Sequence, residues 1–247
     1  MLLPHKQDTI HKAWLLRLLT AICEDTLLSS CLGFKGGTCA ALRNFLNRFS
    51  VDLDFDLLID EKKIPDVRLA LEKIFRNLEL IISDKSAKTS QYFLKYPTEK
   101  TKHRNTIKLD MSFPVPKANT YEMVRLMEID RVVQCQTLET IVANKFITLI
   151  ARFERTGKVA GRDLFDIHHF LLQGYPYSRE VIIEQRKKSL PVFFKELIGF
   201  IEKRVTNTLI DQDLNHLLPQ TEFQAIRKIL KQETLMMLKT ELNTANV

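Results

Sequence analysis

The sequence lacks any apolar run long enough to cross a lipid bilayer, because no stretch approaches the roughly 20 consecutive apolar residues that a membrane helix needs. The apolar segment near the N-terminus is short, is interrupted by Arg17 and lacks a small-residue cleavage site. It therefore does not have the features of a signal peptide. We expect a cytoplasmic protein that does not contact a membrane.

The sequence also lacks the usual thiolate metal motifs and any internal repeat. Its four cysteines form no C-x-x-C pair, and no Cys/His cluster has the spacing of a zinc site. We expect reduced and partly buried thiols. Neither a repeat nor a low-complexity tract is visible, which argues against a solenoid.

A surplus of positive charge is present instead. Against 30 Asp and Glu there are 37 Lys and Arg, which gives a net charge of +7 and favours polyanionic partners such as nucleotides and RNA. Part of this surplus is local: Lys85, Lys88, Lys95, Lys100, Lys102 and Arg104. That segment is either a solvated hairpin or a strip that follows a nucleic-acid backbone, with Tyr92, Phe93 and Tyr96 as stacking partners.

Hydrophobic periodicity divides the chain into two halves. Helices are predicted at 8–22, 39–46 and 66–79, and strands at 51–59, 80–83, 91–96, 106–113 and 121–128. From residue 137 the pattern is helical, with segments at 137–154, 162–173, 178–188, 192–205 and 222–240. We therefore predict an α+β domain over residues 1–135 and a helical domain over residues 136–247 that completes a cleft.

Two carboxylates occupy alternate positions of the predicted strand at 51–59. Asp52 and Asp54 project from the same face, where like charges repel unless a cation neutralises them. Mg²⁺ or Mn²⁺ suits such oxygen ligands, and two ions about 3.5–4 Å apart can hold the attacking and leaving oxygens of a phosphoryl displacement. Asp110 on a later strand is the predicted third ligand. Asp56 is an alternative ligand, although we expect it to face solvent.

A glycine turn precedes these carboxylates. We expect the segment from Gly33 to Thr38 to form a turn that leads into a helix. Because Gly36 and Gly37 have no side chains, a triphosphate can approach the backbone there, and the Thr38 hydroxyl can add a hydrogen bond. Together, the glycine turn and the three carboxylates predict a site for nucleotide and metal.

At these residues the sequence resembles the AbiEii-type nucleotidyltransferases of the DNA polymerase β-like superfamily. The likeness covers about residues 30–170, and four segments carry it: Gly36–Leu42, Arg48–Phe55, Lys145 and Arg162–Asp166. The resemblance implies a nucleotidyltransferase fold, an NTP co-substrate and toxin activity against the 3′ end of tRNA. It also implies a winged-helix antitoxin encoded nearby, and nucleotide-binding roles for Ser50, Lys145 and Arg162.

Lys145 lies at the edge of the apolar stripe of the predicted helix 137–154. A lysine there is partly desolvated, so it either extends to the surface or meets an anion such as a triphosphate. Asp163 and Asp166 share a face of the next helix. Asp163 can cap that helix, and both can act as acid or base near the attacking hydroxyl or anchor Lys145. His168 is expected in the core, and no role is assigned to Asp211 and Asp213.

Three functions are compatible with these observations. The first is an RNA nucleotidyltransferase that acts as a toxin. The second is the same active site acting on a protein or a small molecule, and the third is a binding protein without catalysis. Three clustered carboxylates argue against the third, and the basic segment favours RNA as the acceptor.

Overall fold

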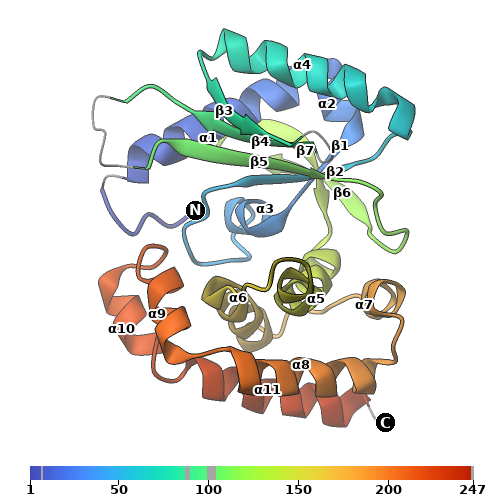
Figure 1. Ribbon diagram of the computed structural model, residues 1–247, viewed down its shortest axis with the longest axis vertical. Coiled ribbons are helices and arrows are strands. Elements are labelled where there is room, and N and C mark those ends of the chain that lie inside the picture. Colours follow the sequence, from blue (N-terminus) through green and yellow to red (C-terminus); the bar gives the residue numbers. More distant parts are fainter. Residues whose placement is uncertain (7, 87–89, 99–103, 246–247) are drawn as a thin grey trace.

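The computed structural model describes residues 1–6, 8–86, 90–98 and 104–245 and contains a mixed sheet between two groups of helices (Figure 1). On one side of the sheet lie α1 (Asp8–Glu24), α2 (Thr26–Cys31) and α4 (Ile64–Asn77), with the short helix η1 (Glu61–Lys63) before α4. On the other side lie α3 (Gly36–Leu42) and the helices that follow the last strand. The predicted α+β class is confirmed.

The sheet of the described residues has seven strands in the order β3-β4-β5-β2-β1-β7-β6. Their bounds are β1 (Leu32–Lys35), β2 (Leu53–Leu57), β3 (Ile81–Lys85), β4 (Ser90–Lys95), β5 (Thr106–Ser112), β6 (Tyr121–Leu126) and β7 (Arg131–Gln136). The central β2 pairs parallel to β5 and antiparallel to β1, and β1 pairs parallel to β7. The carboxylates predicted for the site therefore lie on neighbouring central strands.

The prediction of a turn over residues 33–38 is wrong, because Leu32–Lys35 form β1 and the helix α3 starts directly at Gly36. Although β1 is short, it pairs on both sides, and its side chains are mostly buried. Gly33 permits a close approach here, since a Cβ at this position would lie 2.4 Å from a ring carbon of Tyr121. β7 was also absent from the predicted strands.

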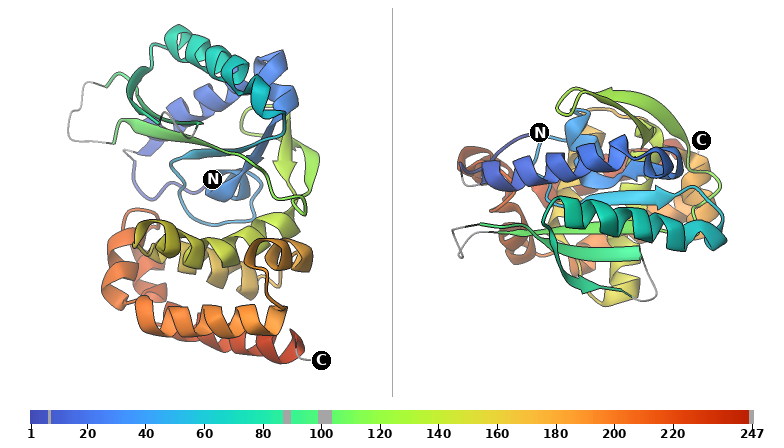
Figure 2. Two further views of the ribbon diagram at one scale, coloured as in Figure 1. Left: turned by 45° about the vertical axis from the view of Figure 1, so that its right-hand side comes forward. Right: turned by 90° about the horizontal axis from the view of Figure 1, so that it is seen from above.

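The helices after β7 form two layers (Figures 1 and 2). The layer next to the sheet contains α5 (Leu138–Thr156), α6 (Gly161–Leu172) and α7 (Arg179–Arg186). Beyond it lie α8 (Leu190–Arg204) and α11 (Leu230–Ala245), while α9 (Asn207–Leu214) and α10 (Gln220–Ile226) lie at one end, beside α6. The predicted helix 222–240 is therefore two helices, because helical periodicity does not distinguish one continuous helix from two with a short break.

Two further expectations concern this helical half. His168 is buried as predicted, and its Nε2 lies 2.8 Å from Glu233. Asp211 and Asp213 belong to α9 and not to an irregular connection, and Asp213 accepts a hydrogen bond from the backbone N–H of Gly161 at 2.6 Å. The division of the chain at residue 135 stays a prediction. Within the described part of the chain, no helix combines the length and apolarity required to span a membrane.

Candidate active site

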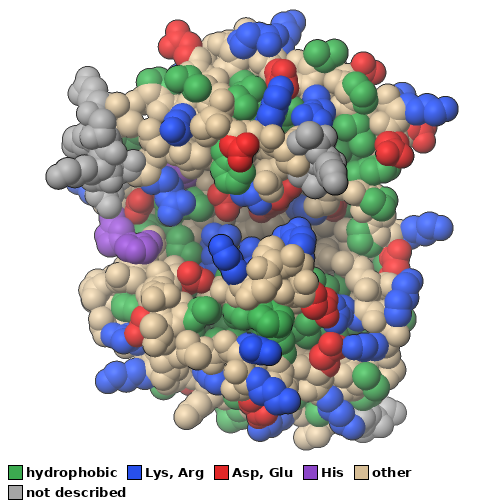
Figure 3. Space-filling view, viewed as in Figure 1, with side chains coloured by type: hydrophobic (Ala, Val, Ile, Leu, Met, Phe, Trp, Pro, Cys, Tyr) green, Lys and Arg blue, Asp and Glu red, His purple; other side chains and the backbone are tan. Residues whose placement is uncertain are grey.

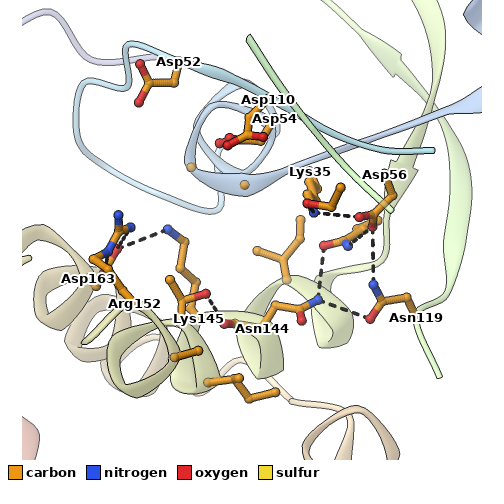
Figure 4. Close-up of a pocket in the computed structure, with 18 of the residues that line it drawn as sticks. Lys35, Asp52, Asp54, Asp56, Asp110, Asn119, Asn144, Lys145, Arg152 and Asp163 are labelled. Carbon is orange, nitrogen blue, oxygen red and sulfur yellow. Dashed lines mark hydrogen bonds and ion pairs between the residues drawn. The ribbon is translucent and has the colours of Figure 1, made fainter. Parts of the chain in front are cut away.

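A cavity of about 450 Å³ lies between the sheet and the layer of α5, α6 and α7 (Figure 4). The sheet contributes carboxylates from β2 and β5, and α5 contributes the opposite wall. The wall residues on α5 are Asn144, Lys145, Thr148 and Arg152 among others, and Thr148 and Arg152 follow at the spacing of three to four residues that shares one helical face. In the space-filling view, acidic side chains line the inside of this hollow and basic side chains its edge (Figure 3).

The structure brings the predicted acidic residues to one side of the cavity. Asp54 on β2 is the register partner of Asp110 on β5, and the two side chains lie together in Figure 4. Asp52 lies just before β2, apart from that pair, and its Oδ2 is 3.8 Å from Arg162. All three residues line the cavity. The pairing of β2 with β5 therefore places Asp54 beside Asp110, whereas Asp52 reaches the cavity from the segment before the strand.

Asp54 has an unfavourable electrostatic environment. Burial raises the pKa of its carboxyl group above the ordinary value, and the neighbouring Asp52 and Asp110 raise it further. Asp110, in contrast, accepts from Lys108 at 2.6 Å and from Gln91 at 3.0 Å. Among the described residues, the carboxylate of Asp54 makes no hydrogen bond or ion pair, and the charges of Lys108 and Lys35 offset the effect on its pKa only in part.

The donor chemistry of this acidic face fits a divalent cation. An uncompensated carboxylate beside two others is the arrangement that a hard cation neutralises. In this conformation, no three described His, Cys, Asp or Glu side chains converge closely enough to form a complete metal site. The metal roles of Asp52, Asp54 and Asp110 therefore stay predictions.

Gly36 and Gly37, which begin α3 and for which we keep the name glycine turn, lie directly against the acidic face. Gly36 has φ +79°, and a Cβ at this position would lie 2.6 Å from Oδ2 of Asp54. At Gly37, which also lines the cavity, a Cβ would lie 2.9 Å from the guanidinium of Arg48. The absence of both side chains leaves the backbone at the start of α3 close to the carboxylates.

Thr38 differs from its expected place. Its side chain is fully buried, and its hydroxyl lies 2.8 Å from Ser50 Oγ and donates to the backbone carbonyl of Asp52 at 2.5 Å. Ser50 lines the cavity, whereas Thr38 does not. The Thr38 hydroxyl is therefore committed to holding the chain in front of Asp52, and its predicted contact with phosphate has no support in this geometry.

Lys145 projects into the cavity from α5 and is only 13% exposed. Its Nζ lies 2.7 Å from Oδ2 of Asp166 and 3.8 Å from Oδ1 of Asp163. Of the two alternatives from the sequence, the surface or an anion, the lysine meets anions, and the chain itself supplies two. Arg152, seven residues and about two turns further along α5, pairs with Asp163 at 2.7 Å.

Asp166 forms a buried bidentate ion pair with Arg48. Arg48 Nε lies 2.5 Å from Oδ1 and Nη2 lies 2.7 Å from Oδ2. Burial alone would raise the pKa of Asp166, but the charges of Arg48 and Lys145 outweigh it and hold that pKa well below its ordinary value. Because Asp166 is fully buried and does not line the cavity, the geometry favours an anchor for Lys145 over an acid or base at the acceptor.

Asp163 is also fully buried, but it lines the cavity. The residue before the first turn of α6 is Ala160, and no side chain caps the helix. Asp163 is therefore not the helix cap that its position near the start of α6 suggested. Its contacts with Arg152 and Lys145 place it among the basic residues on the α5 and α6 side of the cavity. Lys145, Arg152 and Arg162 form what we call the basic wall.

The expectation that Asp56 faces solvent is wrong. Asp56 is fully buried and accepts hydrogen bonds from four side chains. The donors are Lys35 Nζ at 2.6 Å, Tyr121 Oη at 2.6 Å, Gln136 Nε2 at 2.7 Å and Asn119 Nδ2 at 3.3 Å. The alternation of β2 was read correctly, but β1 and β7, which the sequence did not indicate, cover this end of the strand.

Comparison with protein families gives one match over most of the chain. The family described as the nucleotidyl transferase AbiEii toxin of type IV toxin–antitoxin systems matches residues 17–235. The chain belongs to the AbiEii family. Membership supports a nucleotidyltransferase function and implies an antitoxin partner. The match extends well beyond the residues that carry the resemblance in the sequence.

Two solved structures from Helicobacter pylori share the fold of this AbiEii protein. A candidate nucleotidyltransferase is 20% identical with a TM-score of 0.57, and the match covers 96% of this chain and 98% of that one. The protein JHP933 is 18% identical with a TM-score of 0.53, and the match covers 98% and 97%. The comparison with curated proteins found no significant match.

The aromatic rings predicted to stack on nucleic-acid bases are mostly buried in this AbiEii protein. Tyr92 is fully buried against Phe75, and Tyr96 is 2% exposed and packs against Trp14. Neither ring can stack on a base, and only Phe93 of the three is partly accessible. Of the basic residues predicted beside them, Lys88, Lys100 and Lys102 lie outside the described residues.

The same cavity is also lined by polar residues that no sequence pattern indicates: Lys35, Asn119, Gln136, Asn144 and Gln185. Each comes from a different segment, namely β1, the connection before β6, β7, α5 and α7. Amide side chains scattered over the sequence give no pattern by which they can be grouped. Their proximity is visible only in the fold.

Proposed function

We propose that this AbiEii protein transfers a nucleotidyl group from an NTP to RNA, at the 3′ end of tRNA, with Mg²⁺ or Mn²⁺. The observation that carries the proposal is the uncompensated carboxylate of Asp54, which faces the basic wall of Lys145 and Arg162 across one cavity. A cation at the carboxylates and a polyphosphate between them and the basic wall would satisfy both sides at once.

Asp52, Asp54 and Asp110 would hold the divalent ion. When bound, the ion supplies positive charge that neutralises phosphate oxygens during the transfer. The carboxylate face and the glycine turn are adjacent, since Gly36 lies against Asp54. This adjacency supports binding of the triphosphate along the start of α3, with its oxygens directed toward the backbone N–H groups there.

Lys145 and Arg162 would bind the triphosphate from the other side. The Lys145 ammonium has three protons, and its contact with Asp166 at 2.7 Å leaves donors for a phosphate oxygen. Arg162 contacts Asp52 only at 3.8 Å, so its guanidinium is free to turn toward a phosphate. Asp166 and Arg48 would not touch the substrate, and they position Lys145.

The reaction balances without further reactants. A new bond forms between the acceptor hydroxyl oxygen and the α-phosphorus of the NTP. The bond from that phosphorus to the oxygen bridging to the β-phosphate breaks, and pyrophosphate leaves. The hydroxyl proton is released to solvent. Lys145 and Arg162 would stabilise the charge that develops on the leaving pyrophosphate.

An RNA acceptor is supported by charge. The chain carries a net charge of +7, and basic side chains gather at the edge of the hollow in Figure 3. Arg155 and Arg162 are among the cavity-lining residues, so a phosphate backbone that enters would meet positive charge first. For the antitoxin that the family implies, we propose a winged-helix protein.

The test is a labelling experiment with the full chain, Mg²⁺, total bacterial RNA and each NTP in turn. An NTP labelled at the α-phosphate should transfer its label to RNA of tRNA size, whereas the same NTP labelled at the γ-phosphate should not. The Asp54→Asn variant is the matched control. Label in the protein or small-molecule fraction would replace RNA as the acceptor. If label from the γ-phosphate appeared in the RNA, the protein would be a phosphoryl transferase instead.

A further inference from the structure

One end of the cavity is lined by side-chain amides beside the ion pair of Lys35 and Asp56. It contains Asn119, Gln136, Asn144 and Gln185, next to the buried carboxylate of Asp56 (Figure 4). In the same view, this end lies on the opposite side of Asp54 and Asp110 from Arg152 and Asp163. The cavity therefore has a charged end that suits phosphate and an amide end that suits a neutral polar group.

The hydrogen bonds fix the direction of every amide in this group. Asp56, as a carboxylate, can only accept, so Gln136 at 2.7 Å and Asn119 at 3.3 Å must turn their NH₂ groups toward it. Their carbonyl oxygens then face Asn144, whose NH₂ group donates to them at 3.5 and 3.3 Å. The Asn144 oxygen in turn accepts from Gln185 Nε2 at 2.7 Å.

This relay runs from Asp56 to Gln185 and ends in an unused acceptor. Within the described part of the chain, no donor contacts Oε1 of Gln185, and the side chain is only partly buried. Tyr121 strengthens the start of the relay, because burial and Asp56 raise the pKa of its phenol well above the ordinary value and keep it a donor. Gln185 lines the cavity, so the relay ends in a side-chain carbonyl oxygen at the cavity wall.

We infer that this amide relay reads the base of the NTP, with Gln185 as the specificity-determining residue. The inference rests on the proposed function, which places the triphosphate at the charged end. A fixed acceptor selects a base that offers an exocyclic amino group, and it repels a carbonyl oxygen in the same place. Cytosine and adenine carry such an amino group where uracil carries an oxygen. The predicted donors are therefore CTP and ATP in preference to UTP.

A purely structural role for the relay predicts a change in stability and no change in the preference between NTPs. The relay connects strands β2 and β7 to helices α5 and α7, so it also joins the sheet to the helical layer. If that were its only role, loss of Gln185 would lower the stability of the fold and would affect all NTPs equally. Base reading instead predicts a change in the ratio between NTPs at similar stability.

The experiment measures equilibrium binding of CTP, ATP and UTP, and transfer with each, for the full chain in the presence of Mg²⁺. Wild type should bind CTP and ATP at least about tenfold more tightly than UTP, since one buried acceptor left unmet costs about that factor. The Gln185→Leu variant should lose this discrimination. The Gln185→Glu variant cannot donate to Asn144 Oδ1, so it should lose the fixed direction of the acceptor and most of the discrimination. Gln232→Leu, at an exposed position of α11, is the control for the substitution itself.

The relay inference and the proposed function would be overturned by different results. Equal binding of all NTPs by the wild type, with transfer intact, overturns the relay inference and leaves the proposed function standing. Loss of thermal stability in Gln185→Leu with an unchanged CTP to UTP ratio assigns the relay to structure alone and also overturns it. Binding of no NTP overturns both the inference and the proposed function.

Discussion

Arg48 and Asp166 are 118 positions apart in the sequence and form a bidentate ion pair that is buried at both ends. Arg48 lies just before the strand with the acidic residues, and Asp166 lies on α6 beside the basic wall. The pair therefore sets the distance across the cavity. Because Lys145 also contacts Asp166, the same carboxylate holds the lysine that faces the acidic residues.

The first prediction concerns the stability that this pair provides. Asp166→Asn leaves the guanidinium of Arg48 buried without its partner, and breaking such a pair costs about 3–5 kcal/mol. Urea unfolding should show this loss. Asp130→Asn is the matched control, because the pair of Asp130 and Arg125 is exposed and contributes about 1 kcal/mol or less. Equal losses in the two variants would contradict the anchor role of Asp166.

This stability should depend on pH. The pKa of Asp166 is lowered in the folded state, so the carboxylate stabilises the fold above its ordinary pKa near 4. The contribution is lost as the pH falls below that value. The difference in unfolding free energy between wild type and Asp166→Asn should therefore be constant from pH 5 to 7 and shrink below about pH 4.

The second prediction concerns Lys145. Lys145→Ala should weaken NTP binding by about 1.5–3 kcal/mol, roughly 10–100-fold, because a charge-assisted contact in a partly buried cavity is lost. Stability should fall by only about 1 kcal/mol, since Asp166 keeps Arg48 and Asp163 keeps Arg152. Lys145→Arg should restore binding only in part. Large destabilisation with intact NTP affinity would make this lysine structural.

The third prediction separates backbone strain from contact at the glycine turn. Gly36→Ala places a methyl group 2.6 Å from Oδ2 of Asp54 and also strains a backbone at φ +79°. Gly174→Ala carries similar strain at φ +65° but meets no atom within 4 Å. Both variants should lose stability, and only Gly36→Ala should lose transfer activity. Activity lost equally in both would remove the glycine turn from the site.

The fourth prediction concerns Asp54 in the absence of metal. Its raised pKa means that ionisation of this carboxylate opposes folding at neutral pH. Asp54→Asn should therefore raise the thermal midpoint at pH 7, and the gain should vanish as the pH falls below about 4, where the aspartate is protonated in both states. Mg²⁺ should raise the midpoint of the wild type and not that of the variant. A variant less stable than wild type at pH 7 would contradict this.

The sequence predicted the acidic face because strand alternation is local. Asp52 and Asp54 are two residues apart in an alternating apolar segment, so a common side is the expectation from period 2, although β2 itself begins only at Leu53. The place of Asp110 beside Asp54 follows once β2 and β5 pair. Lys145 was found in the same way, from its position on the margin of an apolar stripe.

The remainder of the site depends on contacts between distant segments. Asp56 continues the acidic alternation, but its environment is decided by Lys35 on β1 and Gln136 on β7, and neither strand has a distinctive pattern. Arg48 precedes its strand without any sign of its partner on α6. The amides that meet at Asn144 come from separate elements. The surroundings of Asp56, the partner of Arg48 and the grouping of the amides therefore depend on tertiary packing and not on local sequence patterns.

The most direct test of the account is the rate of α-phosphate transfer from an NTP in the presence of Mg²⁺, compared between wild type and Asp54→Asn. Both proteins should be folded, and the thermal midpoint of each verifies this before the assay. The account predicts transfer by the wild type and a loss of about 10³-fold or more in the variant, because a ligand of the transition-state metal is removed. Transfer at the wild-type rate by Asp54→Asn would contradict it.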